Sequence, residues 1–392
     1  MSSIPPNADP VREQPGQVLV VAPPKRAGRG IALAVLGFIV VSLVLIVVVL
    51  YLFLVLGGTA LLFAAILAVI PLAVVLLGIR WMDRWEPEPR VVLLFAFLWG
   101  AAASIFIALV FSGITQAYVA QHGIGTSGAD LFESVVEAPI VEETAKGMGV
   151  LLIFLVVRKY FDGPMDGIVY GAMIAVGFAF TENLQYFGLA IIDHSGVGET
   201  FLMRAVLSPF AHVMFTSATG LLIGYAARHS NRIGVFGYFI VGLIPATLLH
   251  AFWNSATYWA TDWYRFYFLV EVPLFVLAII GVVRLRRHEQ TITHDRLVEY
   301  AAVGWFTPSE VNQLSTPTGR RQVMAWAKSH GYRRQYRRFL QDATHLAFTR
   351  QRLISGKDRI GARRYEADLL AAVVADRDAL AGLPPLLTRA AR

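Results

Sequence analysis

The chain contains no cysteine, which excludes disulfide bonds, thiolate metal sites and a cysteine nucleophile. It also has little charge. Asp, Glu, Lys and Arg make up 16% of its 392 residues, compared with about 25% in a typical soluble domain. Hydrophobic residues make up 56%, and the mean hydropathy is +0.58. This composition excludes an ordinary soluble domain and predicts a polytopic membrane protein.

A cleavable signal peptide is also missing from the start of the chain. Residues 1–30 are polar and rich in proline, and the apolar run that follows them is long enough to span a bilayer. We therefore expect residues 1–30 to be a disordered cytoplasmic segment. The first apolar helix should stay in the membrane as a signal anchor.

Apolar runs of spanning length recur through the first three quarters of the sequence. They lie at 31–56, 59–79, 91–117, 132–158, 166–192, 201–227, 233–258 and 266–284. Only Gly57 and Gly58 join the first two, which predicts a tight helical hairpin. The sequence therefore predicts an all-α fold, a bundle of about eight transmembrane helices.

Basic residues alternate between the connecting loops. They precede the first run or follow the second, fourth, sixth and eighth runs, as Arg12, Lys25, Arg26, Arg29, Arg80, Arg84, Arg90, Arg158, Lys159, Arg228, Arg232, Arg284, Arg286 and Arg287. The opposite connections carry only Arg265. Because cytoplasmic loops are enriched in Lys and Arg, we expect a multi-pass plasma-membrane protein with both termini in the cytoplasm.

The character of the chain changes after the last apolar run. From His288 onward there are 17 Lys and Arg against 10 Asp and Glu. The sequence TPSEV at 307–311 is typical of a helix start, and amphipathic periodicity continues to about residue 382. We divide the chain into segment 1–30, a membrane domain at 31–287 and a small helical cytoplasmic domain at 288–392. This basic tail either lies near anionic headgroups or is simply a solvated domain; no nucleic-acid partner is predicted.

Glu142, Glu143 and Lys146 stand in the segment EAPIVEETAKGMGVLLIF, which continues into an apolar helix. A charge at mid-bilayer costs at least ~2.5–3.5 kcal/mol on insertion scales, so such residues face the protein interior and usually have a function. Helical spacing places Lys146 within reach of both carboxylates. Adjacent carboxylates point about 100° apart, so one can act as a general base while the other braces a neighbouring helix. The alternative is an amphipathic helix at the membrane interface.

Three further helices carry polar side chains at helical spacing. Phe178, Glu182 and Tyr186 share one face, His212 has Thr216 one turn on, and His250 has Asn254 one turn on. A His and an amide on one face can stabilise an oxyanion. Together the acids and imidazoles are ligands that zinc accepts. Taken singly, Glu182 could instead pin a neighbouring helix, and a lone His is often a packing residue. No HExxH motif is present.

These segments resemble the PrsW-type family of intramembrane proteases. EETAK, from Glu142 to Lys146, matches the EExxK motif of that family, Phe178–Glu182 matches its FxxxE helix, and His250–Asn254 resembles its HxxxN-type motif. DRWEPEPR at 83–90 and the run at 166–183 are also similar, so that the resemblance covers roughly residues 60–260. It implies cleavage of peptide bonds in or near the membrane, as in the release of a transcription regulator from its anchor. A wider group that includes prenyl-protein endopeptidases, with EExxxR, is described both as metalloproteases and as metal-free, glutamate-dependent enzymes.

The residues and the resemblance together predict an intramembrane endopeptidase acting on a membrane protein in the lipid bilayer. One of Glu142 and Glu143, with Glu143 preferred, would activate water, and Lys146 would set the charge state of the pair. Glu182, His212 and His250 would hold zinc or, without metal, position the water; Asn254 would stabilise the oxyanion. Two other classes use the same residues: a proton or cation pathway, and a scaffold that binds a partner helix through polar contacts.

Overall fold

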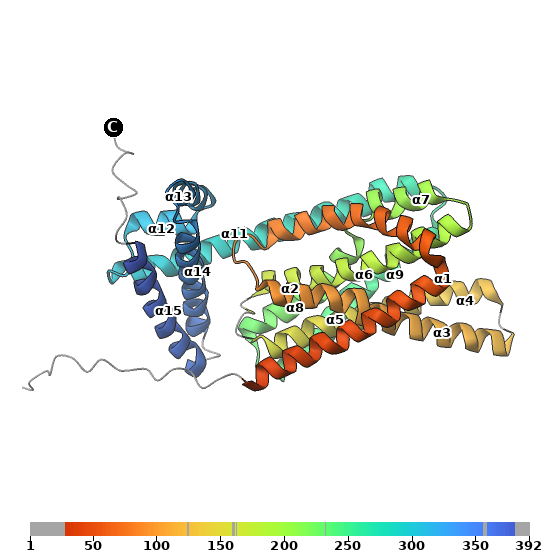
Figure 1. The fold of residues 1–392 in the computed structure, drawn as a ribbon, viewed down its shortest axis with the longest axis horizontal. Helices are drawn as coiled ribbons and strands as arrows, with labels where there is room; N and C mark the ends of the chain where they lie inside the picture. The colour runs from red at the N-terminus through yellow and green to blue at the C-terminus, as the bar shows by residue number, and fades with distance from the viewer. Residues whose placement is uncertain are drawn as a thin grey trace, which may run out of the picture.

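The computed structural model describes residues 28–123, 125–158, 161, 163–231, 233–355 and 359–380. Every regular element in these segments is a helix (Figure 1), which confirms the predicted all-α class. Most of the predicted disordered segment 1–30 lies outside the described residues, as does the Leu383-Pro384-Pro385 end of the tail.

The elements of the apolar part follow one another with few breaks. They are α1 (Gly28–Met82), α2 (Arg90–Leu98), η1 (Trp99–Ser104), α3 (Ile105–His122), α4 (Thr126–Phe132), η2 (Glu133–Glu137), α5 (Ala138–Val156), α6 (Pro164–Ile192), α7 (Val197–Phe201), η4 (Leu202–Leu207), α8 (Ala211–His229), α9 (Gly234–Trp259), α10 (Trp263–Phe266), η5 (Tyr267–Glu271) and α11 (Val272–Ala302). Elements labelled η are π-helical turns, and they join neighbouring α-helices into longer stretches. Six such stretches are long and apolar enough to cross a membrane. The protein is therefore a multi-pass membrane protein.

Helix α1 changes direction at Gly57, whose φ of 73° and ψ of 162° are not helical. Only glycine adopts this region readily, since it has no Cβ. In Figure 1 the second arm of α1 folds back and runs beside α11. The guanidinium of Arg286 on α11 lies 4.4 Å from the ring centroid of Trp81 at the end of that arm.

Helix α6 is the central element of the bundle, with 83% of its most apolar window buried. Its glycines allow backbone-to-backbone contact with α8. A Cβ added at Gly167 would lie 1.9 Å from the carbonyl oxygen of Gly220, and one at Gly220 would lie 2.1 Å from that of Gly167. Small residues four apart are the usual way in which membrane helices pack closely, because apolar surface gains little by burial in lipid.

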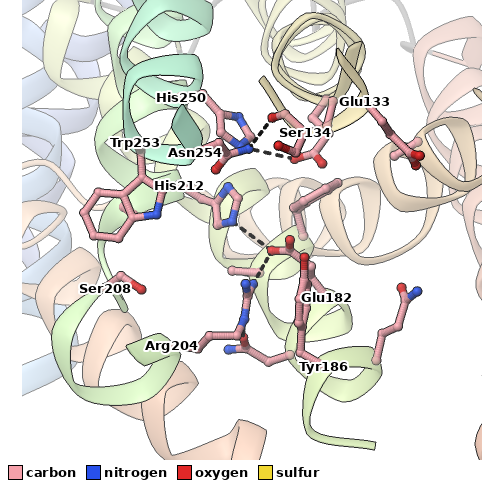
Figure 2. A pocket seen from close by; sticks show the side chains of 18 of the residues that line it. Glu133, Ser134, Glu182, Tyr186, Arg204, Ser208, His212, His250, Trp253 and Asn254 are labelled. Carbon is pink, nitrogen blue, oxygen red and sulfur yellow. Dashed lines mark hydrogen bonds and ion pairs between the residues drawn. The ribbon is translucent and has the colours of Figure 1, made fainter. Parts of the chain in front are cut away.

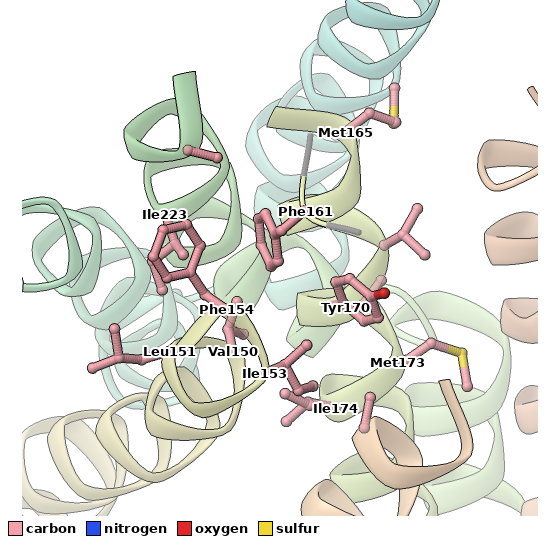
Figure 3. Close-up of a cluster of buried hydrophobic side chains, with 14 of the residues drawn as sticks. Val150, Leu151, Ile153, Phe154, Phe161, Met165, Tyr170, Met173, Ile174 and Ile223 are labelled. Atoms are coloured by element: carbon pink, nitrogen blue, oxygen red, sulfur yellow. The ribbon is translucent and has the colours of Figure 1, made fainter. Parts of the chain in front are cut away.

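An apolar cluster fixes the opposite ends of the same helices (Figure 3). It contains Val150 and Phe154 of α5, Tyr170 of α6 and Ile223 of α8, with Phe161 between the helices. Phe161 packs edge-on against Phe154 and stacks with Tyr170, at centroid distances of 5.2 and 5.4 Å. The cluster and the glycine contacts together set the spacing of α5, α6 and α8.

A second apolar core joins the end of α11 to α12 (Pro308–Ser315), α13 (Pro317–Ser329), α14 (Arg333–Ser355) and α15 (Arg359–Leu380). The predicted helix start at Thr307 is confirmed, since its side chain accepts a hydrogen bond from the backbone N–H of Glu310. Arg320 connects this core to the membrane part. Its guanidinium lies 3.4 Å from the Trp85 ring centroid and donates hydrogen bonds to the carbonyl oxygens of Trp85 and Leu314 and to Thr344.

Candidate active site

The polar residues singled out in the sequence come from four helices and meet beside one cavity of about 830 Å³ (Figure 2). They are Glu142, Glu143 and Lys146 on α5, Glu182 on α6, His212 on α8, and His250 and Asn254 on α9. A proton or cation pathway would spread such groups along the membrane normal, whereas here they gather around one point. This clustering favours a single reaction or binding centre.

Lys146 is at the middle of the cluster, and its side chain is fully buried. Helical spacing brings its Nζ to 3.1 Å from Glu142 Oε2 and 2.9 Å from Glu143 Oε1. His212 Nδ1 lies 3.2 Å from the same nitrogen, and the Phe178 ring centroid lies 3.8 Å from it. An ammonium group has three N–H donors, so these three acceptors use all of them.

The contact with Lys146 also indicates the tautomer of His212. Since Nδ1 accepts a hydrogen bond from the ammonium group, the ring proton must be on Nε2. Nε2 lies 2.8 Å from Glu182 Oε2 and can donate to it. Glu182 therefore acts on the far side of the imidazole ring and fixes its orientation.

Glu143 is completely enclosed. Oε2 accepts a hydrogen bond from Thr216 Oγ1 at 2.8 Å, and Oε1 contacts both Lys146 and His250 Nδ1, the latter at 3.1 Å. Its side chain has no exposed area, whereas Glu142 lines the cavity. Of the two adjacent carboxylates, the cavity thus meets Glu142.

His250 completes the arrangement from α9, and its ring is buried. Because Nδ1–H donates to Glu143, Nε2 keeps its lone pair, and this atom lies 3.9 Å from Glu142 Oε2. Glu142, His212 and His250 each offer one ligand atom within 4.8 Å of one another. One carboxylate oxygen and two imidazole nitrogens form a donor set that catalytic zinc sites use, so these residues fit a metal ion.

Arg204, in η4, was missed by reasoning from the sequence. Its guanidinium forms an ion pair with Glu182, donates from Nε to Asn183 Oδ1 at 2.6 Å, and lies 4.0 Å from the Tyr186 ring centroid. A cation inside an apolar run was a signal that an acid needed a partner. The sequence could not show which acid that was.

Asn254 lines the same cavity but is held by a different neighbour. One of its amide hydrogens goes to the backbone oxygen of Ser134 at 2.7 Å. Side-chain amides have two N–H donors, so this bond fixes the orientation of the group and leaves a second donor. Figure 2 shows Asn254 next to His250.

The cavity reaches the connections that carry few basic residues. Its lining includes Asp130, Gly196, Glu199, Tyr258 and Trp263, which belong to the 118–131, 193–200 and 259–265 regions or their borders. The basic loops are at the other ends of these helices. The cavity is therefore accessible from one side of the bundle.

Comparison with known proteins gives consistent matches over the part of the chain that contains this site. A family model described as PrsW family intramembrane metalloprotease matches residues 88–278. Protease PrsW of Clostridioides difficile is 29% identical over 233 residues, which are 59% of this chain and 93% of that relative. Protease PrsW of Bacillus subtilis is 28% identical over 55% of this chain and 91% of its own length, and that of Oceanobacillus iheyensis is 30% identical over 41% and 69%. No solved structure matches the chain significantly.

Proposed function

The chain belongs to the PrsW family of intramembrane metalloproteases, and from this premise we propose that it hydrolyses peptide bonds of membrane-anchored proteins, such as an anchored regulator, in the cavity between α5, α6, α8 and α9. The observation that carries the proposal is the convergence of Glu142, His212 and His250 within 4.8 Å at that cavity.

We propose eight crossings, two more than the six long apolar stretches. The arms of α1 on either side of Gly57 count separately, and the 19-residue α5 is added. The three charged residues of α5 lower its hydropathy, but they are buried within the protein. With the basic loops in the cytoplasm, both termini and the tail 288–392 are cytoplasmic, residues 31–287 form the protease domain of a plasma-membrane protein, and the cavity opens on the extracytoplasmic side.

We assign the water-facing role to Glu142. Sequence reasoning preferred Glu143, but its oxygens are occupied by Thr216, His250 and Lys146. Glu142 lines the cavity and can accept the proton of an attacking water there. Glu143 then holds the Lys146 ammonium and the His250 ring in place, which is the bracing role expected for one member of the pair.

The residues that would hold a metal ion, with zinc as the proposed species, are Glu142, His212 and His250. A zinc ion there would supply Lewis acidity, which polarises a peptide carbonyl and makes water easier to deprotonate. Glu182, predicted as a ligand, contacts Nε2 of His212 and Arg204 instead, so we propose that it orients His212 from behind. The second amide hydrogen of Asn254 is the proposed donor to the oxyanion.

The test uses membranes that contain single-span proteins, incubated with the full chain in proteoliposomes. New peptide N-termini are then identified by mass spectrometry. The wild-type chain should generate cuts close to the extracytoplasmic membrane boundary, and E142Q should abolish them while the variant still folds. D378N, which neutralises an exposed acid in α15, is the matched control and should cleave normally. Cleavage by E142Q at the wild-type rate would refute the assigned role.

A further inference from the structure

The inference concerns Lys146 and the metal site, and it rests on the proposed function. The ammonium group of Lys146 lies among the atoms that would bind a metal ion, because it contacts both Glu142 Oε2 and His212 Nδ1. Those two residues are members of the group that converges within 4.8 Å. The cluster therefore already surrounds one internal cation.

The contacts of Lys146 use the lone pairs that a metal ion would need. His212 Nε2 carries the ring proton and faces Glu182, so Nδ1 is the ring atom with a lone pair. That lone pair accepts a hydrogen bond from Lys146 and cannot coordinate a metal ion at the same time. Two positive charges at such a separation within a buried site would also repel each other strongly.

We propose that Lys146 competes with a divalent metal ion for Glu142 and His212, so that this lysine sets the metal affinity of the site. Two other partners of the ammonium are outside the metal donor set, namely Glu143 Oε1 at 2.9 Å and the Phe178 ring at 3.8 Å. The ammonium group keeps both when it releases Glu142 and His212. Metal binding then exchanges one cation for another without leaving a buried charge unpaired.

The competing explanation treats Lys146 only as a structural counter-ion of Glu142 and Glu143. Removing such a counter-ion would destabilise the fold and leave the metal affinity unchanged or lower. Competition gives the opposite sign, because removal frees two ligands and takes away a repelling charge. The sign of the change in metal affinity therefore separates the two explanations.

The experiment measures zinc bound to the purified full chain in nanodiscs at buffered free Zn²⁺ concentrations, using elemental mass spectrometry. K146M should bind Zn²⁺ at least about 100-fold more tightly than the wild-type chain, given the size of charge–charge interactions at this separation. E142Q/K146M should lose that gain, which locates the zinc at the cluster. K328M applies the same substitution to an exposed lysine of α13 and should leave the affinity unchanged.

E143Q/K146M removes one acid together with the base and so keeps the net charge of the cluster; its zinc affinity should also rise. The wild-type chain provides a measurement that needs no substitution. In a ¹⁵N-lysine-labelled sample, saturating Zn²⁺ should shift the Nζ resonance of Lys146 and leave that of Lys328 in place. Unchanged zinc affinity in both Lys146 variants, no zinc binding in any variant, or no Lys146 shift on saturation would overturn the inference.

These results are independent of the cleavage assay. If zinc affinity does not respond to Lys146 while E142Q abolishes cleavage, the competition is wrong and the protease proposal stands. If K146M binds zinc more tightly but the wild-type chain cleaves nothing, the metal site is supported and the proteolytic role fails.

Discussion

The contact between α6 and α8 gives the sharpest structural prediction, through the substitution G167A. The added methyl carbon would lie 1.9 Å from the carbonyl oxygen of Gly220, where an ordinary contact needs more than 3 Å. The obstacle is backbone, so no side chain can turn away and the two helices must separate by about 1 Å or more. Overpacking of this kind costs about 1–3 kcal/mol, and we expect the upper end of that range.

The separation also has a functional consequence, because α6 carries Glu182 and α8 carries His212, whose contact is only 2.8 Å long. A misplacement of about 1 Å at a reacting centre can lower a rate about 100-fold. Thermal unfolding in detergent and the cleavage assay measure the two effects. G237A, in α9, is the matched control, since its methyl group meets nothing within 4 Å. If G167A is as stable and as active as G237A, close backbone packing does not position the site.

Three other changes test separate contacts. T216V removes the hydroxyl that donates to Glu143, so unfolding should become easier by about 1.5–3 kcal/mol, the usual value for a hydrogen bond to a charged group; an unchanged melting temperature would contradict this. R320M removes three hydrogen bonds and the contact with Trp85, so hydrogen exchange in α12–α14 should accelerate, and equal protection would show that Arg320 does not hold the tail. Burial raises the pKa of Asp83 to about 7 from 3.8, so the folded state binds that proton more tightly. Its contribution to stability is lost as pH rises from about 4 to 7, by at most about 4 kcal/mol. D83N should remove that part of the pH dependence of the melting temperature, and an identical profile would refute the assignment.

Features that depend on local sequence could be predicted well. Hydropathy over a window of spanning length requires no knowledge of partners, because a bilayer imposes the same length on every helix. The break at Gly57 and the helix start at Thr307 follow from backbone preferences of single residues, and both are present. The helices that carry the site were identified for the same reason, since ionisable residues inside apolar runs are rare.

The role of each polar residue could not be predicted in the same way. Glu142 and Glu143 are neighbours with identical chemistry, and only the rotation of α5 against α8 and α9 decides which one meets the cavity. The partner of Glu182 is Arg204, 22 residues away on a π-helical turn. Hydropathy contains no information about that pairing. Such assignments are tertiary, and a single sequence does not encode them in any local pattern.

Charge balance explains why this polar cluster can exist in a membrane protein and still respond to a ligand. Glu142, Glu143 and Glu182 are compensated by Lys146 and Arg204. With both imidazoles neutral, as their hydrogen bonds indicate, these five side chains have one negative charge more than positive. Pairing removes most of the large penalty for burying charges, while the remaining negative charge attracts a proton or a metal ion to Glu142. The carboxylate that faces the cavity is therefore the one whose charge is least compensated by protein, because Glu143 has three partners and Glu182 has two.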